Sequence, residues 1–383
     1  AFHEPVDRAR FEQSINEGSH DPIPSWMTQF DSQIGFAIRA HCAPLLDLDR
    51  HAPADAYWER RVKLGEQEVT RRFLRAAGVS DWLLDTGYRG PEILRPEGMA
   101  AASGAAVHEI VRIESVAESL VADGVAAADY AEAFRSALRT AAADAVGLKT
   151  VVAYRCGFDL DWTVPAPAEV VDAARRWIGG GGGRLADQVL LRFGVHAALE
   201  LGLPLQFHVG FGDRDLDLHQ VNPSLLMGLL RQPAVAAVPI MLLHCYPYHR
   251  EAGYLAQAFN NVYCDVGEAL NYVGSRAASV IAEVLELAPF AKVLYSSDAW
   301  GPAELHYLGA RLWRDGLASV FGRWVSADEW SQADAIRIAE MMCSGNARRV
   351  YRLDERSGPV AGATTRHAVP DHRELAGWPP DSQ

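Results

Sequence analysis

Three side chains that can bind a metal ion each follow a short apolar run. His208 closes the run "LPLQFH", His244 closes "IMLLH", and Asp298 closes "VLYSSD". A strand covered on both faces gains little from an acid, because desolvating an unpaired charge costs free energy. These side chains are therefore expected beyond the covered part of their strands, where they face solvent, a partner or a metal ion. Asp298 taken alone could instead cap the following helix.

The three residue types suit a divalent metal ion that activates water. Neutral imidazole and carboxylate bind zinc, and they also bind manganese, iron or cobalt, so the sequence does not choose among these ions. Such an ion lowers the pKa of a bound water toward about 7. A nearby carboxylate can take the proton and pass it to a leaving group, and a histidine can stabilise an oxyanion.

Seven apolar runs, each followed by polar residues and a longer helix-like stretch, recur after residue 80. Strands that alternate with helices predict an α/β fold with a parallel sheet. In a (β/α)8 TIM-type barrel the carboxyl ends of the strands converge on one pocket, which would bring His208, His244 and Asp298 together. The runs are residues 82–84, 110–113, 151–154, 203–207, 240–243, 262–264 and 293–295.

The flanking segments differ from the barrel region at 81–353. Residues 1–80 contain charged, amphipathic stretches and are predicted to be a helical insertion packed on the barrel. Residues 354–383 are rich in Pro, Gly and Ser and are predicted to form an extended tail.

The composition favours a cytoplasmic protein. The 383 residues carry a formal net charge of −13 without a run rich in Lys or Arg, so nucleic acid and anionic membrane are not expected as partners. The longest apolar stretch is far shorter than the ~20 residues of a membrane-spanning helix. Five scattered cysteines fit reduced thiols. Barrels of this kind often pair, so a homo-oligomer is an open expectation.

Several longer motifs resemble the amidohydrolase superfamily. They are "PLQFHVGFGD", "LLHCYPYHREAGYLA", "NVYCDVG", "KVLYSSDA" and "SGNARRVYRL". The chain is most similar to the metal-dependent hydrolase branch, which includes amidohydrolase-like domains joined to glutamine-synthetase-like domains. The resemblance runs from about residue 20 to 353.

The resemblance implies that His208 is a metal ligand from the fifth strand. His244, from the sixth, would be a catalytic histidine or a second-metal ligand, and Asp298, from the eighth, a metal ligand and the acid/base.

One motif of the superfamily, His-x-His at the end of the first strand, does not occur in this sequence. We therefore expect the first strand to be missing from the given chain and to lie upstream of Ala1. An alternative places the first strand at residues 34–42, ending in His41. A third possibility is a member that has lost its metal.

Arg112, Glu114 and Arg155 also fall at predicted strand ends. Arginine binds carboxylates bidentately, so these residues predict a substrate that carries a carboxylate. Trp300 is predicted to line the same pocket. Alternatively, these charged groups pair with one another. The main hypothesis is hydrolysis of an amide or related C–N bond in a small polar metabolite, by analogy a γ-glutamyl-type amide. The alternatives are a metal-dependent decarboxylase or other lyase on the same scaffold, and an inactive binding protein.

Overall fold

A parallel six-stranded sheet forms the centre of this computed structural model, which describes residues 1–19, 21–88 and 90–356. The strands lie in sequence order, and every neighbouring pair is parallel. This arrangement confirms the predicted α/β, TIM-type fold. The strands are β1 (Asp81–Asp85), β2 (Ala106–Arg112), β3 (Gly147–Thr150), β4 (Leu205–Val209), β5 (Ile240–His244) and β6 (Val262–Cys264).

The run at 293–295 continues the curve of the sheet without forming a full strand. Val293 joins Cys264 of β6 through a single parallel bridge. Among the described residues, no strand pairs with the outer edge of β1. Segment 293–295 therefore occupies the position beyond β6 expected for the last barrel strand.

Two of the predicted runs extend beyond the carboxyl end of their strand. The run at 151–154 is not a strand, because β3 ends at Thr150 and Val152–Tyr154 form a turn of 3-10 helix. The run at 110–113 extends one residue too far, since β2 ends at Arg112 and Ile113 already begins α6. In both places the apolar run extends past the strand into the turn that follows, so hydrophobicity alone could not locate the strand end.

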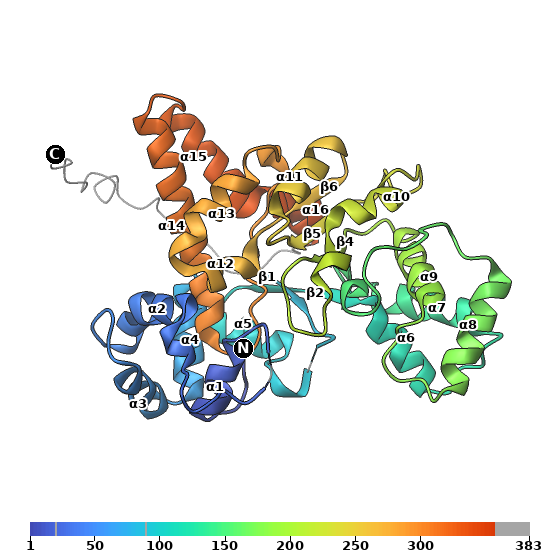
Figure 1. Ribbon diagram of the computed structural model, residues 1–383, viewed down its shortest axis with the longest axis horizontal. Helices are drawn as coiled ribbons and strands as arrows, with labels where there is room; N and C mark the ends of the chain where they lie inside the picture. Colours follow the sequence, from blue (N-terminus) through green and yellow to red (C-terminus); the bar gives the residue numbers. More distant parts are fainter. Residues whose placement is uncertain (20, 89, 357–383) are drawn as a thin grey trace.

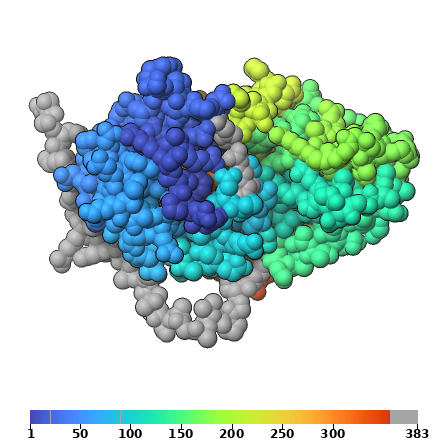
Figure 2. Space-filling view, turned by 90° about the horizontal axis from the view of Figure 1, so that it is seen from below, coloured from blue at the N-terminus to red at the C-terminus, as the bar shows by residue number. Residues whose placement is uncertain are grey.

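The helices lie around the sheet in separate groups. In Figure 1, α1–α5 gather at the lower left, α6–α9 form a lobe at the right, α11 lies above the sheet, and α13–α15 lie to the left of the sheet, above the N-terminal helices. Figure 2 shows the N-terminal region and the α6–α9 lobe at opposite ends of one face. The helices are α1 (Arg8–Ser14), α2 (Gln33–Ala37), α3 (Ala54–Leu64), α4 (Glu66–Ala76), α5 (Pro96–Ser103), α6 (Ile113–Ala122), α7 (Tyr130–Ala141), α8 (Pro167–Gly179), α9 (Gln188–Leu199), α10 (Met227–Leu230), α11 (His249–Ala258), α12 (Gly267–Val273), α13 (Ala277–Val284), α14 (Ala303–Ser326), α15 (Gln332–Glu340), α16 (Asn346–Tyr351) and α17 (Leu353–Arg356).

The N-terminal 80 residues are largely helical, and the alternative first strand at 34–42 is wrong. That segment forms α2 followed by a π-helical turn, Ile38–Cys42. Ile34, Ile38 and Cys42 are buried at a spacing of four residues, which is the period of a helix face rather than of a strand. The division into an insertion, a barrel and a tail remains a prediction, and the tail beyond Arg356 lies outside the described residues.

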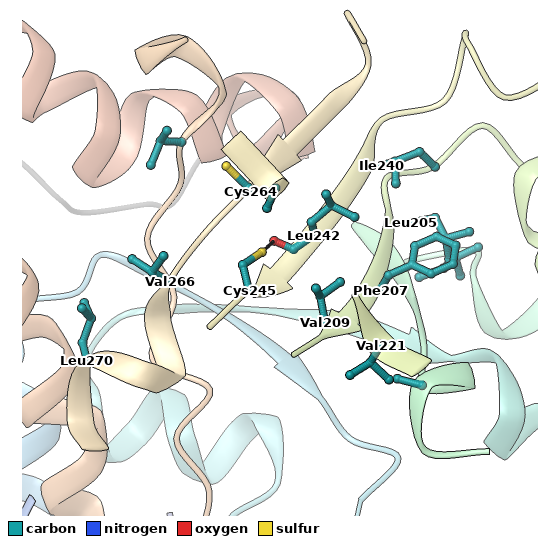
Figure 3. Packing of buried hydrophobic residues seen from close by; sticks show 14 of the residues in the cluster. Leu205, Phe207, Val209, Val221, Ile240, Leu242, Cys245, Cys264, Val266 and Leu270 are labelled. Atoms are coloured by element: carbon teal, nitrogen blue, oxygen red, sulfur yellow. Dashed lines mark hydrogen bonds between the residues drawn. The ribbon is translucent and has the colours of Figure 1, made fainter. Parts of the chain in front are cut away.

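Successive side chains of β4 point alternately toward the surrounding helices and into the barrel interior. Leu205, Phe207 and Val209 of β4 belong to the main hydrophobic core, as Figure 3 shows. The intervening Gln206 and His208 line the cavity inside the barrel. Since successive side chains of a strand point to opposite faces, the outward apolar residues of β4 place His208 inside.

The N-terminal helices are fixed to α14 by buried charges. Arg61 of α3 donates to both oxygens of Glu66 at 2.7 and 2.8 Å and to Oε1 of Glu304 at 2.8 Å. The Tyr57 hydroxyl also donates to Glu304, at 3.1 Å. All four side chains are buried. Their hydrogen bonds join α3 and α4 to α14, which lies more than 200 residues away in the sequence. No helix among the residues that the structure describes has the length and apolar character to cross a membrane.

Candidate metal centre and pocket

Four potential metal ligands meet at the carboxyl ends of the strands. Each of His208, His244, Glu268 and Asp298 offers a donor atom, and these atoms all lie within 4.8 Å of one another. The two imidazole rings are 4.8 Å apart between centroids. His244 Nε2 lies 3.3 Å from Asp298 Oδ2, and its Nδ1 lies 3.8 Å from Glu268 Oε2. The structure thus brings the three predicted residues together and adds Glu268, from the first turn of α12.

Asp265, just after β6, positions several parts of this cluster. Its Oδ1 accepts hydrogen bonds from the backbone N–H of His244 at 3.0 Å and of Gly267 at 2.9 Å, and from Ser296 Oγ at 2.9 Å. A Cβ at Gly267 would collide with the Ser296 carbonyl, so the close approach of α12 requires glycine. His244 and Asp298 have φ values of 71° and 43°, a strained backbone region that often marks functional sites.

The electrostatics favour neutral imidazoles beside an ionised carboxylate. Burial lowers the pKa of His208 well below its ordinary value, and it lowers that of His244 against the opposing charge of Asp298. Burial acts against ionisation of Asp298, but its electrostatic interactions with the His244 ring and the Lys149 ammonium outweigh burial and hold its pKa below the usual range. Burial raises the pKa of Glu268, helped by Glu17 and Asp298.

The buried polar atoms of the cluster fit a divalent metal ion. His208 Nε2, both ring nitrogens of His244 and both carboxylate oxygens of Glu268 are buried without a hydrogen-bond partner. Leaving such groups unsatisfied is costly, because they have lost water without gaining another contact. Two imidazoles and two carboxylates are a donor set that zinc, manganese, iron or cobalt accepts. A bound ion would compensate these atoms together.

The cluster borders a large cavity, which is lined by three of the residues predicted to bind substrate. The cavity has a volume of about 1040 Å³, and Arg112, Arg155 and Trp300 line it. Arg155 pairs with Glu118 at 2.9 Å, and Arg112 pairs with Asp85. Trp300 packs in a T-shaped contact against Phe2 with ring centroids 5.3 Å apart, and Tyr88 makes a similar contact at 5.7 Å.

Glu114 does not line this cavity. It lies on α6 instead of β2, is buried, and accepts hydrogen bonds from Thr150 Oγ1 at 2.5 Å and from Val151 N–H at 3.0 Å. Burial raises the pKa of its carboxyl group. Glu114 therefore ties α6 to the end of β3, and the geometry does not support its predicted contact with substrate. The direct ion pairs of the two arginines are with other acids, Arg112 with Asp85 and Arg155 with Glu118, while Glu114 interacts with both arginines only through longer-range charge.

Two charged residues that the sequence interpretation missed lie close to the cluster. Lys149 of β3 places its Nζ 3.7 Å from Asp298 Oδ1 and 3.4 Å from Asp85 Oδ2. Glu17, which follows α1, lines the cavity and accepts a hydrogen bond from the Tyr272 hydroxyl at 3.3 Å. Burial, Asp298 and Asp213 together raise the pKa of Glu17 to about 7.

The raised pKa of Glu17 predicts a pH effect on stability. The folded protein holds this proton up to about pH 7, whereas the unfolded chain releases it near the ordinary value of 4.5. Between these two pH values the free energy of unfolding should fall as pH rises, and above pH 7 it should stay at the lower value.

Glu17→Gln should therefore stabilise the chelator-treated protein at pH 8 by about 1–3 kcal/mol, with little effect near pH 4.5. Urea unfolding at both pH values measures this difference, with the exposed Glu4→Gln as the control. An equal effect of Glu17→Gln at the two pH values would contradict the prediction.

Comparisons with known proteins decide the family. The amidohydrolase family model matches residues 47–353. The chain belongs to the amidohydrolase family. A curated relative, Protein fluG of Emericella nidulans, is 31% identical over 299 residues, which cover 69% of this chain and 34% of fluG. The chain thus spans about a third of the length of that relative.

Solved structures show the same fold. A candidate metal-dependent hydrolase from Lactobacillus casei ATCC 334 is 27% identical, with a TM-score of 0.81 over 92% of this chain and 93% of its own. Uronate isomerases from Thermotoga maritima and Bacillus halodurans are 12% and 14% identical, with TM-scores of 0.54 and 0.55. Each matches 84% of this amidohydrolase-family chain, and they cover 78% and 77% of their own chains; they support the fold alone. Family membership and the donor cluster together indicate a divalent metal centre.

Proposed function

We propose that this amidohydrolase-family chain is a metal-dependent enzyme that hydrolyses an amide or other C–N bond. Its substrate would be a small, polar metabolite that carries a carboxylate. The observation that carries the proposal is the cluster of His208, His244, Glu268 and Asp298, with unpartnered buried donors beside a large cavity. Zinc is the proposed ion, because imidazole and carboxylate are its usual ligands in catalytic sites. A cytoplasmic location and a homo-oligomer remain proposals from the sequence.

The ion, when bound, would lower the pKa of a water molecule and polarise the scissile carbonyl. His208 and His244 would hold it as neutral imidazoles, a state that burial favours in both. Asp298 remains ionised and is partly open to the cavity, with 32% of its side chain exposed. It can therefore accept a proton from the attacking water and later donate that proton to the leaving nitrogen.

Arg155 is the proposed contact for the substrate carboxylate. Its guanidinium lines the cavity and pairs with Glu118, which also accepts a hydrogen bond from Leu185 N–H at 2.9 Å. Since Glu118 keeps that second contact, removing the guanidinium should leave the fold intact. Arg112, which also lines the cavity, is a second candidate.

Arg155→Ala is expected to raise KM or lower kcat/KM about 10- to 100-fold, because a charge-assisted contact with the substrate carboxylate is lost. Steady-state kinetics of the purified variant measure the change, and its circular dichroism spectrum checks the fold. Arg175→Ala, which removes an exposed arginine paired with Asp172, is the matched control. Kinetics of Arg155→Ala that equal those of this control would refute the assignment.

Product analysis in isotopically labelled water tests the proposed reaction. The zinc-loaded protein should release an amine or ammonia from a member of a panel of carboxylate-bearing amides, including γ-glutamyl amides. One ¹⁸O atom from the solvent should appear in the new carboxylate. Release of CO₂ without ¹⁸O in the product would instead identify a decarboxylase. No turnover of any panel member by the zinc-loaded protein would favour a binding protein.

A further inference from the structure

Glu17 brings a carboxylate to the cavity from outside the donor cluster. Its side chain lines the cavity and accepts a hydrogen bond from the Tyr272 hydroxyl at 3.3 Å. Among the residues that the structure describes, no lysine, arginine or histidine forms an ion pair with this carboxylate. An acid enclosed by protein is ordinarily paired with a cation, because an unpaired charge that has lost water is costly. Glu17 therefore offers the cavity a negative charge that the described residues leave unpaired.

The acids around Glu17 make this part of the cavity strongly negative. Asp213 and Asp298 also line the cavity, and burial and their charges together raise the pKa of Glu17. A divalent ion in the donor cluster would compensate Asp298 and Glu268. Glu17 is not one of the four donors, so it would still lack a paired cation. This part of the cavity therefore suits a positively charged group of the substrate.

Positive charge gathers around Arg155, the proposed contact for the substrate carboxylate. Burial lowers the pKa of Arg155, and the neighbouring charge of Arg184 lowers it further. Arg184 also lines the cavity; it pairs with Asp215 at 3.0 Å and donates to the Tyr154 carbonyl oxygen at 2.9 Å. The Tyr154 ring lies 4.6 Å from the ring of His208. Tyr154 thus joins the two arginines to the donor cluster.

Glu17 is joined to the donor cluster through a different element. Tyr272, which donates to Glu17, follows Glu268 on α12 by four residues, about one helical turn. The arginines reach the cluster from the segment that follows β3, through Tyr154. A substrate amide held at the cluster would therefore have both an acid and a pair of arginines within the same cavity.

We propose that Glu17 binds an ammonium group of the substrate, which would then be a zwitterionic amide with its carboxylate at Arg155. An ammonium group donates strong, charge-assisted hydrogen bonds to a carboxylate. Such a site rejects an analogue without the amine, because the acid is then left without its partner. This inference rests on the proposed function and narrows its substrate class.

Three matched amides test the inference on the zinc-loaded protein. Glutaryl butylamide carries only the carboxylate, γ-glutamyl butylamide adds an amine to the acyl part, and glutaryl 4-aminobutylamide adds an amine to the leaving part. At least one of the two amines should be hydrolysed with a kcat/KM about 10- to 100-fold above that of glutaryl butylamide. Any other amide of the panel that is hydrolysed is compared in the same way with its analogue in which hydrogen replaces the amine.

The outcomes separate this inference from the proposed function. Hydrolysis that is no faster with an amine than without one would overturn the inference and leave the proposed function standing. No turnover of any amide would overturn the two together.

Glu17→Gln assigns the preference to this residue. Glutamine still accepts a hydrogen bond from Tyr272 but lacks the charge, so the ratio of kcat/KM between the preferred amine and its amine-free analogue should fall close to 1. Glu17→Asp keeps the charge and should retain part of the preference. If Glu17 were merely structural, its replacement would lower kcat/KM for both compounds and keep their ratio. Glu4→Gln removes an exposed acid that does not line the cavity and should keep the wild-type ratio. A wild-type ratio in Glu17→Gln would overturn the assignment of the ammonium site to Glu17.

Discussion

Asp298→Asn is expected to lower kcat/KM by about 10³- to 10⁴-fold on whichever amide the wild type hydrolyses. Asparagine has nearly the same shape, but it cannot accept and return a proton as a carboxylate does. It also removes the negative charge that lies 3.3 Å from His244 and 3.7 Å from Lys149. Proton transfer should therefore be slower, and the ion should bind less tightly.

Steady-state kinetics at saturating zinc separate these two effects, because excess zinc compensates for weaker binding but not for a missing base. Asp315→Asn is the matched control, since Asp315 of α14 is exposed and pairs with Arg311 on the same helix. Retention of more than about a tenth of wild-type kcat/KM by Asp298→Asn would be incompatible with a role in proton transfer.

Arg61→Met is expected to cause the largest loss of stability, about 3–5 kcal/mol, because it leaves two buried carboxylates without their cation. Glu66 and Glu304 receive three hydrogen bonds from this guanidinium, and the side chains of Arg61, Glu66 and Glu304 are 3%, 4% and 0% exposed. Denaturant unfolding measures the change. Because the group joins α3 and α4 to α14, the N-terminal helices should also become more sensitive to proteolysis.

Arg71→Met removes an arginine from a solvent-exposed pair with Glu68 and serves as the control for Arg61→Met. An exposed pair contributes about 0–1 kcal/mol, so the control should remain close to the wild type. A similarly small effect of Arg61→Met would show that the buried group does not hold the N-terminal helices in place.

The sequence predicted the site residues whose signal is local. His208 and His244 end apolar runs that form strands, and parallel topology brings the ends of such strands together. The resemblance to the amidohydrolase superfamily added the roles, and the match of the family model confirms the family itself. The residue type and its place at the end of an apolar run were sufficient to predict these two histidines, because neither signal depends on which helix packs against the site.

Residues that reach the site from other elements could not be predicted in this way. Glu268 lies in the first turn of α12, where an acid ordinarily signals a helix start. Lys149 lies inside β3, and Glu17 arrives from the N-terminal segment through packing between distant parts of the chain. Glu114 was misplaced for the opposite reason, since the apolar run before it continues beyond β2 into α6.

Metal content is the measurement that tests the central claim most directly. Elemental analysis of the purified chain after incubation with zinc and gel filtration should find about one or two ions per chain, as catalytic zinc sites hold. The double variant His208→Ala/Asp298→Ala, treated identically and checked for its fold, should contain none. Zinc in the wild type but not in this variant would establish the centre at the ends of β4 and β5. No zinc in either protein, or equal zinc in both, would contradict the assignment of these residues as a metal site.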